Sequence, residues 1–149
     1  MGKAAAFGET AMRYLPLLAA LVLAGCGTPR AVHPGLQSDI GVFSNAQTVQ
    51  VHLANFDFTP PLIHMRAGRP YRLELTNDAG GAHNFSAPRF FGAARVAPRD
   101  LAIVSRGKVE LRAGESRTVH VIPTRGVYKV VCSHLGHAVL GMTARIVVD

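Results

Sequence analysis

Cysteines, acidic residues and long apolar runs are scarce in this sequence of 149 residues. The only cysteines are Cys26 and Cys132, so at most one disulfide can form within the chain. The apolar run 15–23 is interrupted only by Pro16 and is too short to span a bilayer as a helix. No basic run is interleaved with aromatic residues, which argues against nucleic-acid binding. The length suits one domain with a modest core.

The shortage of acidic residues makes the chain strongly basic. The sequence has 16 Lys and Arg against 9 Asp and Glu. Beyond residue 25 the counts are 14 and 8, a net charge of +6, and 12 of the 14 basic residues are arginine. We interpret this excess as a charged, solvated surface that attracts acidic protein partners.

The N-terminal stretch has the form of a bacterial secretory signal. Arg13 precedes the apolar run 15–23, and the run ends in Leu23-Ala24-Gly25-Cys26. That ending resembles the lipobox of bacterial lipoproteins, which implies cleavage before Cys26 and a diacylglyceryl group on its thiol. Because Met12 lies directly before Arg13, either Met1 or Met12 could be the true start.

Lipidation of Cys26 would leave Cys132 as the only thiol. A lone thiol in an oxidising compartment is open to oxidation unless a bound metal occupies it. A Cys26–Cys132 disulfide is the alternative, and the lipobox argues against it. We therefore divide the chain into a lipoprotein signal peptide at 1–25, a flexible tether at 26–46 and a folded domain at 47–149. By resemblance to lipoprotein sorting, Gly27 favours the periplasmic side of an outer membrane, where the organism has one.

The remainder of the chain shows the alternation of β-strands. Val49, Val51 and Leu53 alternate with more polar residues, and the stretch 71–75 repeats the pattern. Turn residues separate the strands at regular intervals, and no internal repeat is present. Seven or eight short strands of this kind predict an all-β sandwich. Strands are expected at 49–58, 62–66, 71–76, 109–111, 118–122, 127–132 and 143–148, with an eighth at 101–104.

One segment breaks the β pattern. Ser86 is a candidate helix cap, and the apolar residues Phe90, Phe91, Ala94 and Ala97 form a partial helical stripe. We expect a short helix packed on the sandwich and ended by Pro98. The role of the insertion 86–108 stays open.

The loop after the strand 127–132 carries a thiol, an imidazole and a thioether at Cys132, His137 and Met142. A further imidazole, His83, follows a Gly-rich loop far upstream. One thiolate, two imidazoles and a weak thioether are the ligand set of a mononuclear blue-copper site. A core methionine is the alternative role for Met142.

The spacing C-x4-H-x4-M of Cys132, His137 and Met142 resembles the ligand loop of cupredoxins, the small blue-copper proteins. His83-Asn84-Phe85 is similar to their upstream ligand motif, and the resemblance extends over Val49 to Val148. It implies a Greek-key β-sandwich that binds one copper ion at His83, Cys132, His137 and Met142. It also implies that Asn84 joins the two ligand loops by backbone hydrogen bonds.

His134 fits no spacing of that family. It is expected near solvent or beside the ligands, but it is also an alternative ligand, because Cys132 with three histidines would suit zinc. A binuclear copper site would need a cysteine where Gly136 stands, and the His-x-His pairs of multicopper oxidases are absent. Three further histidines are expected on strand surfaces: His52, His64 and His120.

The function implied by this resemblance is single-electron transfer by a lipid-anchored periplasmic protein. We expect a monomer that is not itself an enzyme. Its partners are expected to be redox proteins, acidic ones among them, such as a cytochrome or a membrane oxidase or reductase. A carrier that delivers copper to a periplasmic or membrane enzyme is the alternative. A structural sandwich with a vestigial site is a third interpretation.

Overall fold

The computed structural model describes residues 41–149. The predicted signal peptide, both candidate start residues, Cys26 and most of the predicted tether lie outside the described residues. Within the part that is described, no helix is long and apolar enough to cross a membrane.

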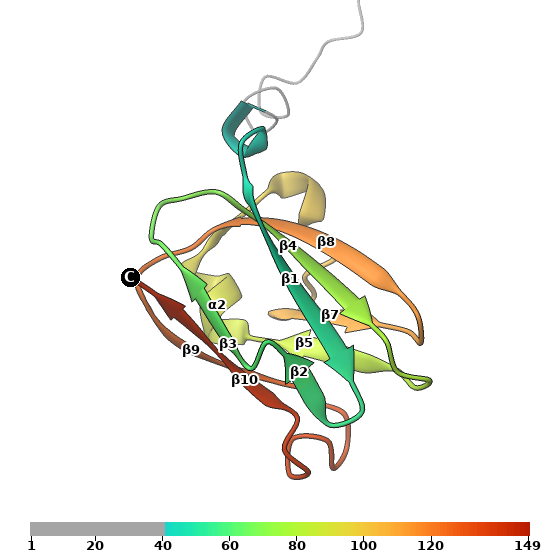
Figure 1. Cartoon of the computed structure of the whole chain (residues 1–149). Coiled ribbons are helices and arrows are strands. Elements are labelled where there is room, and N and C mark those ends of the chain that lie inside the picture. Colours follow the sequence, from blue (N-terminus) through green and yellow to red (C-terminus); the bar gives the residue numbers. More distant parts are fainter. Residues whose placement is uncertain (1–40) are drawn as a thin grey trace, which may run out of the picture. The chain divides into compact units, whose positions relative to one another are not determined.

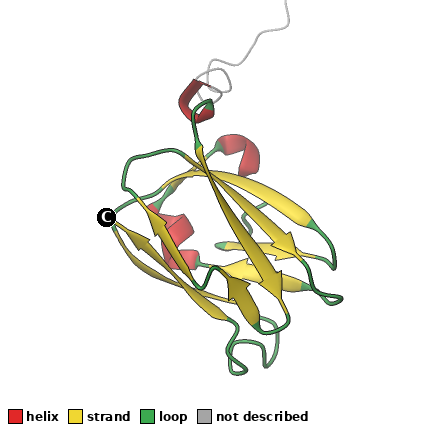
Figure 2. Ribbon diagram, in the orientation of Figure 1, coloured by secondary structure: helices red, strands yellow, loops and turns green. Residues whose placement is uncertain are grey.

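Two five-stranded sheets form the domain. Figures 1 and 2 show how the strands are arranged in space. The first sheet has the order β2-β1-β4-β8-β6 and the second β3-β10-β9-β5-β7. The strands are β1 Gln47–Ala54, β2 Asp57–Thr59, β3 Leu62–Met65, β4 Tyr71–Asn77, β5 His83–Ser86, β6 Arg95–Val96, β7 Lys108–Leu111, β8 Ser116–Ile122, β9 Gly126–Val131 and β10 Thr143–Val148. The all-β sandwich predicted from the sequence is confirmed.

The core lies between the two sheets, because alternate residues of the longer strands point inward. In β4, Tyr71, Leu73 and Leu75 are buried while the residues between them are exposed or half-buried. In β10 the same period buries Ala144, Ile146 and Val148. A fully buried side chain such as Leu73 contributes about 1.5–3 kcal/mol over an exposed one. Alternation of this kind is what the sequence pattern predicts.

The predicted number of strands, seven or eight, is wrong, since the described residues contain ten. Phe56 adopts a φ of 63° and turns the chain between β1 and β2, so the predicted strand 49–58 is an antiparallel pair. The two-residue strand β6 pairs with the end of β8. Residues 101–104 form a turn instead of the expected strand, with the Ile103 N–H donating to the Asp100 carbonyl at 2.9 Å.

The predicted helix exists but is shorter than expected. It is α2, Pro88–Ala93, and its buried residues Phe90 and Phe91 pack against the core. Ser86 does not cap it: Ser86 ends β5, and Ala87 stands at the cap position without a side-chain hydrogen bond. Pro98 does not end it either, because Pro98 begins the 3-10 turn η1, Pro98–Asp100.

The chain contacts the domain before β1 begins. Phe43, within the predicted tether, is buried and meets the ring of His120 edge-on at a centroid distance of 5.5 Å. The Arg99 guanidinium lies 5.9 Å from the centre of the Phe43 ring. His120 is therefore partly covered, and its Nδ1 lies 2.8 Å from Asp100 Oδ2. His52 and His64 are exposed, as expected for strand surfaces.

Candidate metal centre

Neighbouring strands of the second sheet bring together the predicted site residues. Cys132 follows directly after β9, and His83 is the first residue of β5. These two strands are adjacent, with Ser86 opposite Val131. Met142 precedes β10, which pairs with β9 along its whole length. The pairing of β5, β9 and β10 thus brings His83, Cys132 and Met142 to the same end of the sheet.

Three side chains converge on one point. The sulfur of Cys132 lies 3.8 Å from Nδ1 of His83 and 3.4 Å from Nδ1 of His137, and the two nitrogens are 3.1 Å apart. Donor atoms bound to one ion at 2.0–2.3 Å and 100–120° apart would be separated by roughly 3.1–3.9 Å. The observed separations fall within this interval, so the three residues could hold a single metal ion.

The environment of His83 favours the neutral imidazole that binds a metal. The residue is 2% exposed, and its Nε2 has no hydrogen-bond partner among the described residues. Burial, with repulsion from His137 and His134 adding to it, lowers the pKa of His83. A neutral ring has one nitrogen with a free lone pair, and Nδ1 is the one that faces Cys132 and His137. The site therefore fits a metal at Nδ1.

The backbone of Met142 closes the base of the ligand loop. Its N–H donates to the His137 carbonyl at 3.0 Å, and its carbonyl accepts the Cys132 N–H at 3.1 Å. The Met142 side chain is fully buried. All four predicted ligands are thus gathered in one region, in a group that could hold a single ion.

Asn84 joins the two ligand segments. Its Oδ1 accepts the Ser133 backbone N–H at 2.9 Å, directly beside Cys132. Its Nδ2 donates to the Ser133 hydroxyl at 3.0 Å and to Glu110 Oε2 at 3.1 Å. Since Asn84 is buried, these bonds fix the loop relative to β5.

His134 is not part of the metal-ligating group in the described chain. Its Nε2 bonds to Glu110 Oε1, and its ring stacks on His137 with centroids 5.6 Å apart. Burial alone would raise the pKa of Glu110, but hydrogen bonds from His134 and Asn84 outweigh burial and hold that pKa below its usual range. Sequence reasoning missed Glu110, because only the pairing of β5 with β7 places it opposite Asn84.

Comparison with solved structures relates this arrangement to known proteins. Auracyanin B matches with a TM-score of 0.51 and 22% identity, over 70% of this chain and 89% of that one. The cupredoxin fold is therefore present. A reduced auracyanin from the photosynthetic bacterium Roseiflexus castenholzii has a TM-score of 0.54 and 16% identity, over 70% of this chain and 98% of that one.

Larger proteins contain the cupredoxin fold as well. The multicopper oxidase McoA from the hyperthermophile Aquifex aeolicus matches with a TM-score of 0.53 and 16% identity. The match covers 70% of this chain but only 30% of the oxidase chain. The likeness to it thus covers one part of that enzyme. No family model matches the sequence, and no curated protein matches it.

Apolar side chains surround the exposed edge of this centre. Leu135, Val139 and Leu140 are 102%, 91% and 63% exposed. Phe56, 44% exposed, meets the His137 ring edge-on with centroids 5.5 Å apart. We call these four residues the loop-end patch. Sequence reasoning missed Phe56, which comes from the β1–β2 turn.

Proposed function

We propose that this protein binds one copper ion at His83, Cys132, His137 and Met142 and carries single electrons between redox proteins. The supporting observation is the convergence of one thiol and two imidazoles at separations that suit one ion. A soft thiolate beside borderline nitrogen donors, with a thioether nearby, favours copper. Copper, when bound, supplies the one-electron couple.

The protein's own contribution is rigidity. Cys132 and His83 are buried at the ends of paired strands, and Asn84 holds the loop to β5. The loop is also tied at its base by the Cys132–Met142 backbone bond. Donor groups fixed in this way move little when the charge of the site changes, which favours fast electron transfer. A bound copper ion would occupy the Cys132 thiolate and the imidazole nitrogens, the groups that could otherwise act as nucleophile and base. We therefore propose a carrier, not an enzyme.

The loop-end patch is the proposed contact with redox partners. Its exposed side chains lie beside His137, the proposed ligand nearest to solvent. Small apolar surfaces of this kind suit short-lived complexes, and the basic net charge would steer acidic partners toward the protein. A monomer would leave the patch accessible.

Visible absorption of the copper-loaded protein tests the proposal. We expect a strong thiolate-to-copper band and a reversible one-electron wave in voltammetry. Cys132→Ser should remove the band, and His137→Ala should open the site to added imidazole. His134→Ala should leave the band nearly intact, and exposed His64→Ala is the matched control. Loss of colour in His134→Ala but not in His137→Ala would contradict the ligand assignment and favour a zinc site of Cys132 with three histidines.

The same measurements separate electron transfer from copper delivery. A delivery protein would release its copper to a second chelating protein and would need neither the strong band nor reversible voltammetry. A vestigial site would bind no stoichiometric copper. Either result would overturn the electron-carrier proposal.

We further propose that Cys26 carries a lipid and that the domain works on the periplasmic side of a bacterial membrane, the outer membrane where there is one. The support is the lipobox-like Leu23-Ala24-Gly25-Cys26. Several acyl chains bind a bilayer firmly, whereas one binds weakly. Mass spectrometry of the mature N-terminus tests this, and an unmodified Cys26 in a soluble periplasmic extract would contradict it.

A further inference from the structure

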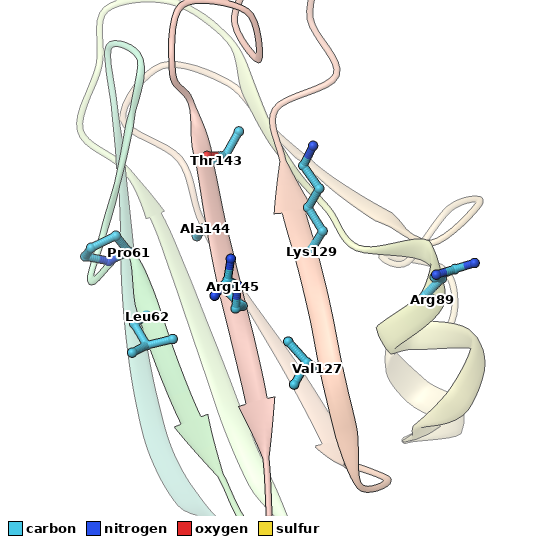
Figure 3. Close-up of a pocket in the computed structure, with 8 residues that line it drawn as sticks. All are labelled: Pro61, Leu62, Arg89, Val127, Lys129, Thr143, Ala144 and Arg145. Carbon is cyan, nitrogen blue, oxygen red and sulfur yellow. The ribbon is translucent and has the colours of Figure 1, made fainter.

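A shallow groove of about 600 Å³ crosses the outer face of the second sheet. It extends over β3, β10 and β9, with Arg89 of α2 beyond β9, as Figure 3 shows. Its lining residues are Pro61, Leu62, Arg89, Val127, Lys129, Thr143, Ala144 and Arg145. None of the proposed metal ligands and none of the loop-end patch is among them.

The groove concentrates positive charge without compensation. Three of its lining residues are cationic, Arg89, Lys129 and Arg145, and none is acidic. Within residues 41–149, no carboxylate lies within 4.0 Å of these three side chains, whereas Arg72 and Arg117 pair with glutamates. The surplus of basic residues is thus partly gathered at one place.

Two of these cations stand directly opposite each other. The register of β9 and β10 pairs Lys129 with Arg145, and both are exposed on the outer face. Like charges at directly opposite positions destabilise a sheet. An unfavourable contact of this kind, with no compensating contact beside it, is expected where the residues are needed for function. The pair therefore indicates a negatively charged ligand.

Apolar surface accompanies the charge. Leu62 of β3 is paired with Arg145 of β10 and is 45% exposed, and Val127 of β9 is 67% exposed. A flat membrane cannot follow a hollow between side chains, but an extended polypeptide can. Three adjacent strands are about 10 Å wide, which corresponds to roughly three residues of an extended segment. Carboxylates can then meet the cations while a neighbouring apolar side chain contacts Leu62 or Val127.

We propose that this groove binds an acidic segment of a partner protein. The segment's carboxylates pair with Arg89, Lys129 and Arg145. The binding needs no metal, although β9 and β10 also lead to Cys132 and Met142. It is also separate from the loop-end patch. Failure of this proposal and failure of the copper proposal are therefore distinguishable.

Titration of ¹⁵N-labelled full-length protein with hexaglutamate tests the groove at low salt. We expect shifts of the backbone amides in β9, β10 and α2 for both metal-free and copper-loaded protein. Hexalysine should cause none, and added salt should reverse the effect. Shifts spread over the whole surface, or no binding, would overturn the proposal.

Matched triple variants separate the groove from net charge. Arg89→Gln, Lys129→Gln and Arg145→Gln together should weaken hexaglutamate binding about tenfold. The control combines Arg69→Gln, Arg95→Gln and Arg125→Gln, exposed residues that lie outside the groove and remove the same charge. The control should change binding less than about twofold. Equal losses of hexaglutamate affinity in both variants would overturn the proposal. A groove variant that no longer binds vesicles of anionic lipid, but still binds hexaglutamate as the wild type does, would also overturn it.

Stability provides an independent measurement. Lys129→Glu replaces a repulsive cross-strand pair with an attractive one, so the melting temperature should rise by roughly 1–6 °C. The same substitution should weaken hexaglutamate binding. Reduced stability together with unchanged binding would refute the argument that the like-charged pair serves a ligand.

Discussion

Asn84→Asp should destabilise the domain although it replaces only one non-hydrogen atom. Oδ1 can still accept the Ser133 N–H, but the donor atom Nδ2 is lost. That atom lies 3.1 Å from Glu110 Oε2 and 3.0 Å from the Ser133 hydroxyl. The new oxygen would therefore face a carboxylate at about the same distance.

The magnitude follows from these contacts. Loss of a buried donor costs about 1–3 kcal/mol. Repulsion between the two carboxylates adds to this, but Glu110 is half exposed, so solvent screens most of it. We expect a total of about 2–3 kcal/mol at neutral pH, or a melting temperature lower by roughly 10–20 °C in a domain of this size.

Urea unfolding of the metal-free protein measures the loss in the free energy of unfolding. A double-mutant cycle shows how much of this loss comes from the contact between residues 84 and 110. Glu110→Gln restores a donor opposite the new carboxylate, so the double variant should recover at least about 1 kcal/mol relative to additivity. A stability of Asn84→Asp within about 0.5 kcal/mol of the wild type would refute the importance of this contact. Strict additivity of the two substitutions would refute the Asn84–Glu110 interaction.

Further predictions concern other parts of the protein. The folded-state pKa of His83 is lowered, so the unfolded chain gains its proton first on acidification. The metal-free protein should thus lose stability below about pH 6.5. In chemical unfolding, His83→Gln should remove the part of the pH dependence of stability that comes from His83. Met142→Leu should keep the copper and the colour but raise the reduction potential measured by voltammetry, since the oxidised ion loses more from losing a donor. Val139→Asp should slow bimolecular electron transfer in stopped-flow kinetics without altering the spectrum, and an unchanged rate would place the electron exit elsewhere. Cys26→Ser should leave the protein unprocessed or soluble in membrane fractionation.

The sandwich and the convergence of His83, Cys132 and His137 follow from the sequence because both depend on local patterns. Alternating residues in β4 and β10 indicate which face is buried. The spacing of Cys132, His137 and Met142 brings three of the candidate ligands into one loop. His83 could be added only because a second motif, His83-Asn84, accompanies it.

Features that depend on register could not be predicted in this way. Glu110 meets Asn84 because β5 and β7 pair at those residues, and no local pattern encodes that pairing. Phe56 reaches His137 through a turn with positive φ, an unusual conformation for an aromatic residue. The groove likewise depends on the register of β9 and β10, which places Lys129 directly opposite Arg145.

The contact of Phe43 with His120 has a consequence for orientation. It fixes the start of the described chain at one end of the sandwich, and the loop between β9 and β10 lies at the other end (Figure 1). A chain held to a bilayer upstream of Gly41 would therefore be attached at the end of the sandwich opposite to Leu135, Val139 and Leu140. Diffusing proteins in the aqueous space could then reach these residues without competing with the membrane surface.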